Sequence, residues 1–91
     1  MVISAQLSLY PLRQADLSPA IQVVGDALRG AGLQPQIGPM STLVTGEAAV
    51  IFAALHDAFV RAAAMGHVVM TVTVSNACPV GGQATRAVGH F

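Results

Sequence analysis

The fold is decided by the segment Val2-Ile3-Ser4-Ala5-Gln6-Leu7-Ser8-Leu9-Tyr10, which alternates between apolar and polar side chains. Apolar residues occupy the odd positions from 3 to 9, and hydroxyl or amide residues occupy the even positions from 4 to 10. A period of two over this length predicts a strand with one face on a core. The other face of this strand then carries polar groups that bear no charge.

A second alternating segment, at residues 68–75, predicts a strand of the same kind. Valine and methionine occupy its even positions, and mostly hydroxyl residues alternate with them. The two segments together predict the residues on the helix-facing side of the sheet: Ile3, Ala5, Leu7, Leu9, Val68, Met70, Val72 and Val74.

Two helices and a hairpin are predicted between these strands. The first helix begins at Ser18-Pro19, a serine N-cap followed by proline at the first helical position, and it ends at Gly30. Residues 33–37 and 40–45 predict a hairpin whose second strand ends at Gly46. A second helix is expected at residues 48–65, with a buried stripe formed by Phe52, Leu55, Phe59 and Ala62.

The order strand, helix, strand, strand, helix, strand predicts an α+β, ferredoxin-like βαββαβ fold. Right-handed crossovers then place both helices on one face of a four-stranded antiparallel sheet. We expect one ligand-binding domain over residues 1–79. Residues 80–91 contain several glycines and lack periodicity, so they are expected to form a flexible tail.

The composition excludes several classes of function. Among 91 residues, four are basic and four are acidic, so the formal net charge is zero. No residue is lysine, which excludes a P-loop ATPase, Schiff-base chemistry and pyridoxal phosphate attachment. Four scattered arginines do not form the basic stripe that nucleic-acid binding requires. Because 54% of the residues are apolar, we expect part of the surface to be buried in a homo-oligomer.

The sequence shows no catalytic or metal-binding constellation. The single cysteine, Cys78, follows the end of a predicted strand that begins at His67, and His56 lies on a helix. The histidines share no ligand spacing, and the carboxylates form no close pair. We therefore expect no enzymatic activity, no metal and no cofactor. The lone cysteine and the interrupted apolar segments favour a cytoplasmic protein without membrane insertion.

The sheet face away from the helices is expected to be polar but uncharged. The first and last strands, taken as the two central ones, present on it Ser4, Gln6, Ser8, Tyr10, Thr71, Thr73 and Ser75. A merely solvated face usually carries lysine, glutamate and arginine. This composition therefore favours sheet packing in an oligomer, or a ligand pocket at the edge of such an interface.

Three stretches carry a family resemblance: ISAQLSLYPL at residues 3–12, GPMSTLVTG at 38–46 and VTVSNACP at 72–79. In this order they resemble the YkoF-like family of thiamine- and hydroxymethylpyrimidine-binding proteins. The resemblance implies a ferredoxin-like fold, a binding role in thiamine precursor uptake or salvage, and no catalysis. It also implies pairing of two such units. This chain carries one unit, so we expect a dimer or tetramer through the sheet face, with a transporter as a further partner to consider.

The resemblance and the open sheet face together suggest the ligand contacts. An aminopyrimidine presents an amino donor beside a ring-nitrogen acceptor, which a carboxamide matches with two parallel hydrogen bonds. Gln6 and Asn76 are the candidates for this role. The remaining candidates are Ser8, Ser41, Thr42 and Thr73 for hydroxyl contacts, Tyr10 and Met40 for covering the ring, and Glu47 for a thiazolium cation.

The sequence therefore predicts a non-catalytic protein that binds thiamine or its hydroxymethylpyrimidine precursor. Two alternatives stay open at this point. One is an interaction module whose polar sheet face only mediates assembly. The other is a regulatory amino-acid-binding domain of similar topology.

Overall fold

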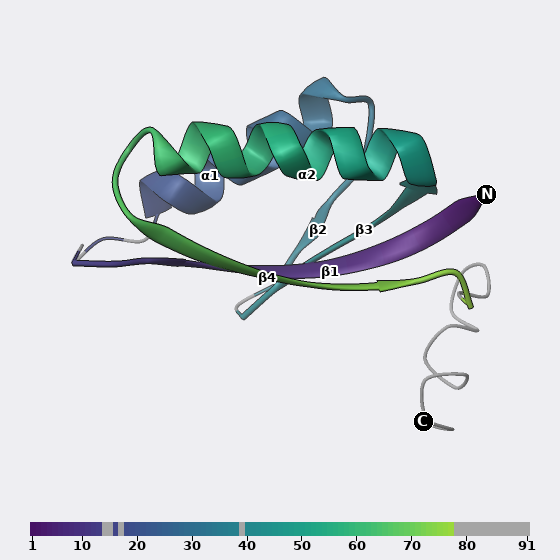
Figure 1. Ribbon diagram of the computed structural model, residues 1–91, viewed down its shortest axis with the longest axis horizontal. Helices are drawn as coiled ribbons and strands as arrows, with labels where there is room; N and C mark the ends of the chain where they lie inside the picture. The colour runs from purple at the N-terminus through teal and green to yellow at the C-terminus, as the bar shows by residue number, and fades with distance from the viewer. Residues whose placement is uncertain (14–15, 17, 39, 78–91) are drawn as a thin grey trace.

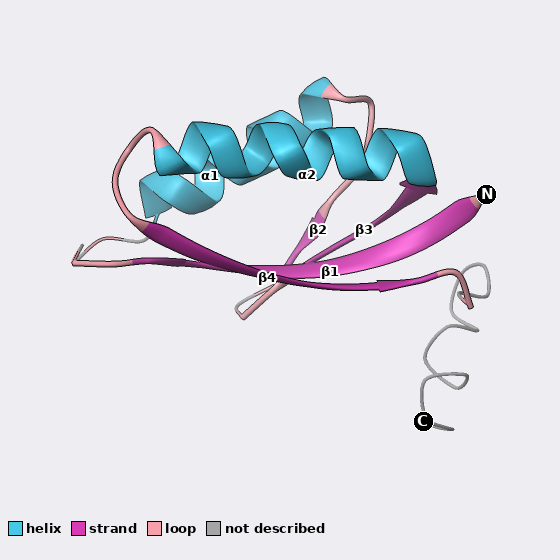
Figure 2. Cartoon of the chain, viewed as in Figure 1, coloured by secondary structure: helices cyan, strands magenta, loops and turns pink. Residues whose placement is uncertain are grey.

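Four strands and two helices follow one another in the predicted order (Figure 1). The computed structural model describes residues 1–13, 16, 18–38 and 40–77. Its elements are β1 (Val2–Pro11), α1 (Ser18–Gly30), β2 (Gln36–Ile37), β3 (Thr42–Glu47), α2 (Ala48–Ala63) and β4 (Val68–Ser75). The strands pair antiparallel in the spatial order β2-β3-β1-β4. Both helices cover one face of this sheet (Figure 2), so the predicted α+β ferredoxin-like fold is confirmed.

The alternation in β1 places its odd-numbered residues against the helices. Ile3, Ala5 and Leu7 are 3%, 0% and 2% exposed. They form one core cluster with Leu28 of α1 and Ile51 of α2. Full burial of a large apolar side chain contributes about 1.5–3 kcal/mol. This core therefore determines which residues of β1 face outward.

The β2–β3 hairpin begins later in the chain than predicted. β2 comprises only two residues, because the preceding Pro35 has no N–H to donate. β3 begins at Thr42 and continues through Gly46, so the prediction that Gly46 ends this strand is wrong. A Cβ on Gly46 would lie 2.8 Å from Leu33 Cδ2. The glycine thus permits the segment after α1 to approach β3 closely.

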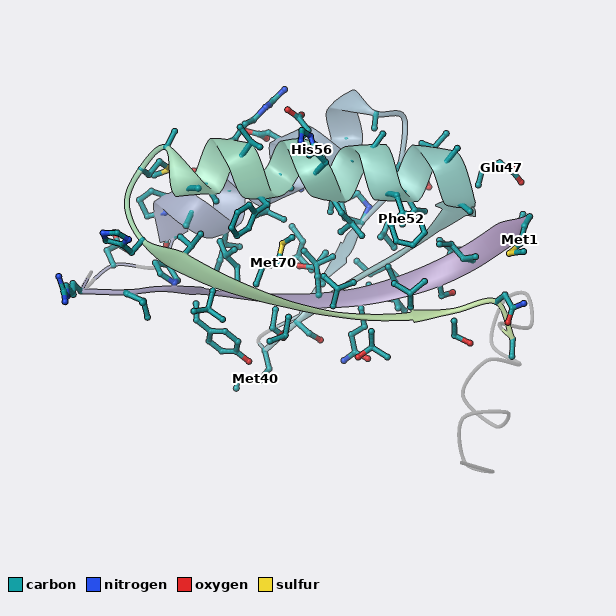
Figure 3. The ribbon with its side chains drawn as sticks, viewed as in Figure 1. Met1, Met40, Glu47, Phe52, His56 and Met70 are labelled. Atoms are coloured by element: carbon teal, nitrogen blue, oxygen red, sulfur yellow. The ribbon has the colours of Figure 1, made fainter. Side chains whose placement is uncertain are left out.

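The buried stripe of α2 differs from the predicted one. Phe52 and Phe59 are 54% and 40% exposed, so their assignment to the core is wrong. Phe52 lies on the flank of α2 and points down toward the sheet (Figure 3). Small residues replace the rings on the inner face, where α2 packs against α1 and the sheet. The buried residues of α2 are Ile51, Ala54, Leu55, Ala58 and Ala62.

β4 is an edge strand that the helices cover incompletely. The sheet order makes β1 and β3 central, so the interpretation of β4 as a central strand is wrong. Val72 and Val74 pair with Leu7 and Ala5. Because paired residues of a ladder point to the same face, both valines face the helices as predicted. They remain 36% and 39% exposed, because an edge strand has a neighbouring strand on one side only.

Several sequence predictions concern residues outside the described ranges. They are the end of the domain at residue 79, the flexible tail at 80–91, and the surroundings of Cys78 and His90. Within the described ranges, no helix is long and apolar enough to cross a membrane. In the same ranges, His, Cys, Asp and Glu residues form no group of three that suits a metal ion.

Candidate ligand-binding site

The open face of the sheet, which lies away from the helices, is arranged in cross-strand rows around Gln6. In the middle row, Gln6 lies between Leu43 of β3 and Thr73 of β4. One row along, Ser4 pairs with Thr45, and their hydroxyl oxygens are 3.0 Å apart. Hydroxyls and a carboxamide therefore occupy the centre of this face, as the alternation predicts.

Gln6 bonds to the turn that joins β2 to β3. Its Nε2 donates to Ser41 Oγ over 3.1 Å, which leaves one N–H and the carbonyl oxygen of the carboxamide for a ligand. An open cavity of about 340 Å³ adjoins this pair. Its lining consists of Gln6, Gln36, Ile37, Gly38, Ser41 and Leu43. This volume is within the range of about 300–1,000 Å³ that small-molecule sites occupy.

A smaller cavity lies at the same end of β3. Ser8 Oγ donates to the Met40 carbonyl oxygen over 3.0 Å, which ties β1 to the turn. The cavity measures about 120 Å³ beside this bond. Ile37, Gly38 and Ser41 line both cavities. The two cavities therefore adjoin one another beside these three residues.

Six of the nine predicted contacts meet at this end of the sheet. They are Gln6, Ser8, Tyr10, Met40, Ser41 and Thr42, each of which lines one or both cavities. Met40 is 78% exposed, and it projects from the face opposite the helices (Figure 3). Tyr10 is 47% exposed, so both side chains are accessible to a flat ring. Thr42 is buried and pairs with Leu7, so it faces the helix side.

The other three predicted contacts lie elsewhere. Glu47 pairs with Val2, and its carboxylate is 3.2 Å from the Met1 amino group. It is four residues along β3 from the Gln6 row, about 13 Å at the usual strand rise. Asn76 follows the end of β4, also at the end of the sheet away from the turn. Thr73 is the neighbour of Gln6 but lines neither cavity.

The site is electrostatically neutral. Among the described lining residues of both cavities, Tyr10 is the single ionisable side chain. The Ser41 hydroxyl accepts a hydrogen bond from the Gln6 amide, and the Ser8 hydroxyl donates one to the Met40 carbonyl oxygen. Neither hydroxyl therefore has a general base as its hydrogen-bond partner. Polar contacts on partly apolar walls suit a polar, uncharged heterocycle.

The sequence prediction omits Gln36, a second carboxamide in the larger cavity. Gln36 and Gln6 both pair with Leu43, from opposite sides. A signal for this residue exists, because Gln34 and Gln36 alternate around Pro35 on an edge strand. A period of two places both amides on one face. Ile37 and Gly38 have no comparable signal, because only the turn geometry brings them to the site.

The fold and the site define the class of the protein, a small ferredoxin-like α+β protein whose open sheet face is polar and uncharged in its central rows. A model of the YkoF-related family matches residues 2–81. The chain therefore belongs to this family, and the resemblance seen in the sequence is confirmed. No curated protein has significant sequence similarity to the chain.

Solved structures of low sequence identity share the fold. A hypothetical protein from Methanocaldococcus jannaschii has a TM-score of 0.80 at 18% identity, over 99% of this chain and 98% of its own. A protein from Streptococcus pneumoniae has a TM-score of 0.81 at 21% identity, over 96% and 99%. A Thermotoga maritima protein has a TM-score of 0.80 at 13% identity, over 96% and 99%. This last protein is provisionally assigned to thiamine biosynthesis or salvage.

Proposed function

We propose that this chain is a non-catalytic binding protein for hydroxymethylpyrimidine or thiamine in thiamine precursor uptake or salvage. The observation that carries the proposal is the Gln6–Ser41 hydrogen bond beside a cavity of about 340 Å³. This bond orients a carboxamide while leaving a donor and an acceptor free. The family and the Thermotoga maritima neighbour support a thiamine-related role.

The chemistry of the cavities fits the pyrimidine half of thiamine better than the thiazolium half. Donors and acceptors of Gln6, Ser8 and Ser41 match a neutral ring with amino, ring-nitrogen and hydroxyl groups. The carboxylate on the described open face, Glu47, lies at the other end of the sheet. A thiazolium cation therefore has no carboxylate as counter-ion among the described lining residues of the cavities. We accordingly propose that recognition rests on the pyrimidine.

The expected affinity is modest. Each neutral hydrogen bond contributes about 1 kcal/mol net, and contact of the ring with Tyr10 or Met40 adds a similar amount. A few such contacts correspond to a Kd in the micromolar range at best.

We further propose that the chain acts in the cytoplasm as a homodimer or tetramer that packs through the open face. Leu43 and Val69 are 41% and 45% exposed on this face, and its central rows carry no charge. Packing of this face against a second copy would therefore desolvate no charged group in the central rows, which favours a contact between proteins. The same observation favours the second candidate function, an assembly module without a small ligand. A transporter that receives the ligand is a further proposed partner.

Isothermal titration calorimetry tests the proposal. We expect saturable heat with hydroxymethylpyrimidine and with thiamine, and none with 5-(hydroxyethyl)-4-methylthiazole, which lacks the pyrimidine. Heat from thiazole alone would move recognition to the other half of thiamine. If a folded oligomer gives no binding heat with any of the three compounds, the result would favour the assembly module.

A matched pair of variants tests whether the ligand binds at Gln6. Gln6→Ala removes the carboxamide that bonds to Ser41 and should weaken binding at least tenfold, with the oligomer intact. Gln22→Ala makes the same change on the exposed surface of α1 and should bind as the wild type does. Unchanged affinity in Gln6→Ala would place the ligand elsewhere, and dissociation of the oligomer would identify the face as primarily an interface.

A further inference from the structure

The outer edge of β3 is covered by β2 along only part of its length. β2 pairs with Thr42 and Leu43, whereas β3 continues to Glu47. Among the described residues, positions 44–47 of β3 therefore have a neighbouring strand on the β1 side alone. A third cavity, of about 440 Å³, lies on the uncovered side between the segment at residues 32–36 and β3. We call it the edge cavity.

The end of α1 keeps the chain away from this edge. The N–H of Gly32 donates to the Arg29 carbonyl over 2.9 Å, and the N–H of Leu33 donates to the Leu28 carbonyl over 3.1 Å. These bonds hold the chain against α1, and Gly32 has the positive φ of 85° that is typical of such a helix end. The chain then descends from the helix layer and joins the sheet only at β2 (Figure 1). It therefore reaches the sheet too late to cover β3 beyond Leu43.

The main-chain groups of Thr45 point toward the edge cavity. In an antiparallel ladder, the N–H and C=O of one residue point to the same neighbour, and successive residues alternate between neighbours. Ala48 N–H donates to the Met1 carbonyl over 2.9 Å, so the even-numbered residues of β3 address β1. Its odd-numbered residues address the other side, where Leu43 pairs with Gln36. Thr45 is the next of them, and within the described part of the chain its N–H and C=O have no main-chain partner.

The walls of the edge cavity combine two carboxamides with apolar side chains. Gln34 and Gln36 are both exposed, and no hydrogen bond to another described residue engages either carboxamide. Leu33 packs closely on Gly46, where an added Cβ would lie 2.8 Å from its Cδ2. The lining contains no ionisable side chain, so an ion would find no counter-charge there. The volume is within the range of about 300–1,000 Å³ for small-molecule sites, so the cavity suits a small uncharged ring.

The open main-chain groups determine which polar groups such a ring must carry. A donor and an acceptor on one residue are matched by a ligand that has an acceptor beside a donor. A cyclic amide has this arrangement, because the ring holds its C=O and N–H on the same side. In a cyclic imide, a second carbonyl on the far side of the N–H can also accept a hydrogen bond from a carboxamide.

We propose that the edge cavity is a second binding site, which takes a small uncharged cyclic imide through the main chain of Thr45 and the carboxamide of Gln34. Thr45 N–H donates to one ligand carbonyl, and the ligand N–H donates to the Thr45 carbonyl. The Gln34 carboxamide donates to the second ligand carbonyl, while Leu33 and Leu43 contact the ring. This inference goes beyond the proposed function, because Gln34 and Thr45 line neither of the cavities beside Gln6 and Ser8.

Solution NMR of the ¹⁵N-labelled full chain tests the site with glutarimide, a six-membered ring whose N–H lies between two carbonyls. Glutarimide should move the Thr45 amide proton downfield in a saturable way. It should also slow the exchange of this proton with solvent at least tenfold, because the N–H gains an acceptor. The amide of Thr73, which pairs with Gln6 in the middle row, should stay in place. N-Methylglutarimide lacks the donor and should bind about tenfold more weakly.

Competition with hydroxymethylpyrimidine separates this inference from the proposed function. An excess of hydroxymethylpyrimidine should leave the Thr45 shift caused by glutarimide unchanged. Competitive displacement of glutarimide would overturn the second site and leave the proposed function standing. The absence of a saturable Thr45 shift up to the solubility limit of glutarimide would overturn the second site as well. A Thr45 shift in a chain that binds neither hydroxymethylpyrimidine nor thiamine would support the edge cavity and overturn the proposed function.

An isosteric substitution gives an independent readout. Gln34→Glu keeps the shape of the side chain but replaces its N–H donor with a carboxylate oxygen, so glutarimide should bind about tenfold more weakly. 2-Piperidone, a cyclic amide without the second carbonyl, should lose less than about twofold. Gln22→Glu makes the same change on the exposed surface of α1 and should leave both affinities unchanged. Thermal unfolding verifies that both variants are folded. Wild-type affinity for glutarimide in Gln34→Glu, or an equal loss with 2-piperidone, would contradict the proposal.

Discussion

The two faces of β1 have opposite chemistry although one short segment supplies both. Ile3, Ala5 and Leu7 are almost fully buried beneath α1 and α2. Gln6 and Ser8 point the other way and donate hydrogen bonds to the Ser41 hydroxyl and the Met40 carbonyl oxygen. The covered face must be apolar and closely packed, whereas the open face needs only to stay polar. The open face is therefore the one that is free to carry recognition.

This difference teaches that the odd-numbered residues of β1 serve stability, whereas the even-numbered residues are available for binding. Because the side-chain period of a strand is two, a shift of one residue would exchange the two faces completely. Substitutions at odd positions of β1 should therefore affect folding, and substitutions at even positions should affect binding or assembly. Variants that test this separation follow, from the largest expected effect to the smallest.

A pair of leucine truncations compares the two faces directly. Leu7→Ala removes a side chain that is 2% exposed and should lower the free energy of unfolding by about 2–5 kcal/mol. Leu43→Ala makes the same change on the open face, where the side chain is 41% exposed in the single chain, and should cost less than about 1 kcal/mol when the chain is monomeric. Urea denaturation over a range of protein concentrations measures both values. A larger loss at Leu43 that grows with protein concentration would come from the proposed oligomer, whereas equal losses that do not depend on concentration would contradict the division between the two faces.

A charge on the open face tests the proposed assembly. Thr73 lies beside Gln6 in the central row, so Thr73→Arg would bury an unpaired charge at a sheet-to-sheet interface. We expect at least a tenfold rise in the dissociation constant of the oligomer, about 1.4 kcal/mol, with an unchanged far-UV spectrum. Sedimentation velocity measures the association, and Thr73→Ser serves as the uncharged control. Undiminished association would place the contact elsewhere, for example at the exposed edge of β4.

The smallest effect is expected on α2, away from both faces of β1. Arg61 Nη2 lies 3.0 Å from Asp57 Oδ2, with both side chains about half exposed. Arg61→Ala should lower the free energy of unfolding by about 0.3–0.5 kcal/mol, because solvent screens such a pair. Measured again at 1 M salt, the difference should fall toward zero. A loss as large as that of Leu7→Ala would contradict the division between the faces of β1 and the rest of the surface.

Much of the fold was predictable because its signals are local. The alternation of β1 and β4 and the serine and glycine ends of α1 each depend on neighbouring residues only. Phe52 and Gly46 were misjudged for a different reason. The position of Phe52 depends on how closely the alanines of α2 approach α1, and Gly46 is needed where Leu33 packs on β3.

The candidate site was predictable in its residue types and only partly in its geometry. Gln6 and Ser8 occupy polar positions of an alternating strand and Ser41 comes directly before another strand, all of which the sequence reveals. The separation of Glu47 and Asn76 from them follows from the register of β3 and β4 against β1. No local pattern encodes that register, so the sequence grouped residues that lie at opposite ends of the sheet.

The sequence by itself determined that this protein has two alternating strands, two amphipathic helices, and a sheet face of hydroxyls and amides without charge. The strands follow from side chains that alternate with a period of two, and the helices follow from apolar side chains three and four residues apart. The tertiary structure alone decided which polar groups meet and where the cavities lie. The physical reason is that β3 stops at Thr42 while β1 continues to Pro11, so the smaller cavity forms beside the end of β1 through long-range pairing that no short segment specifies.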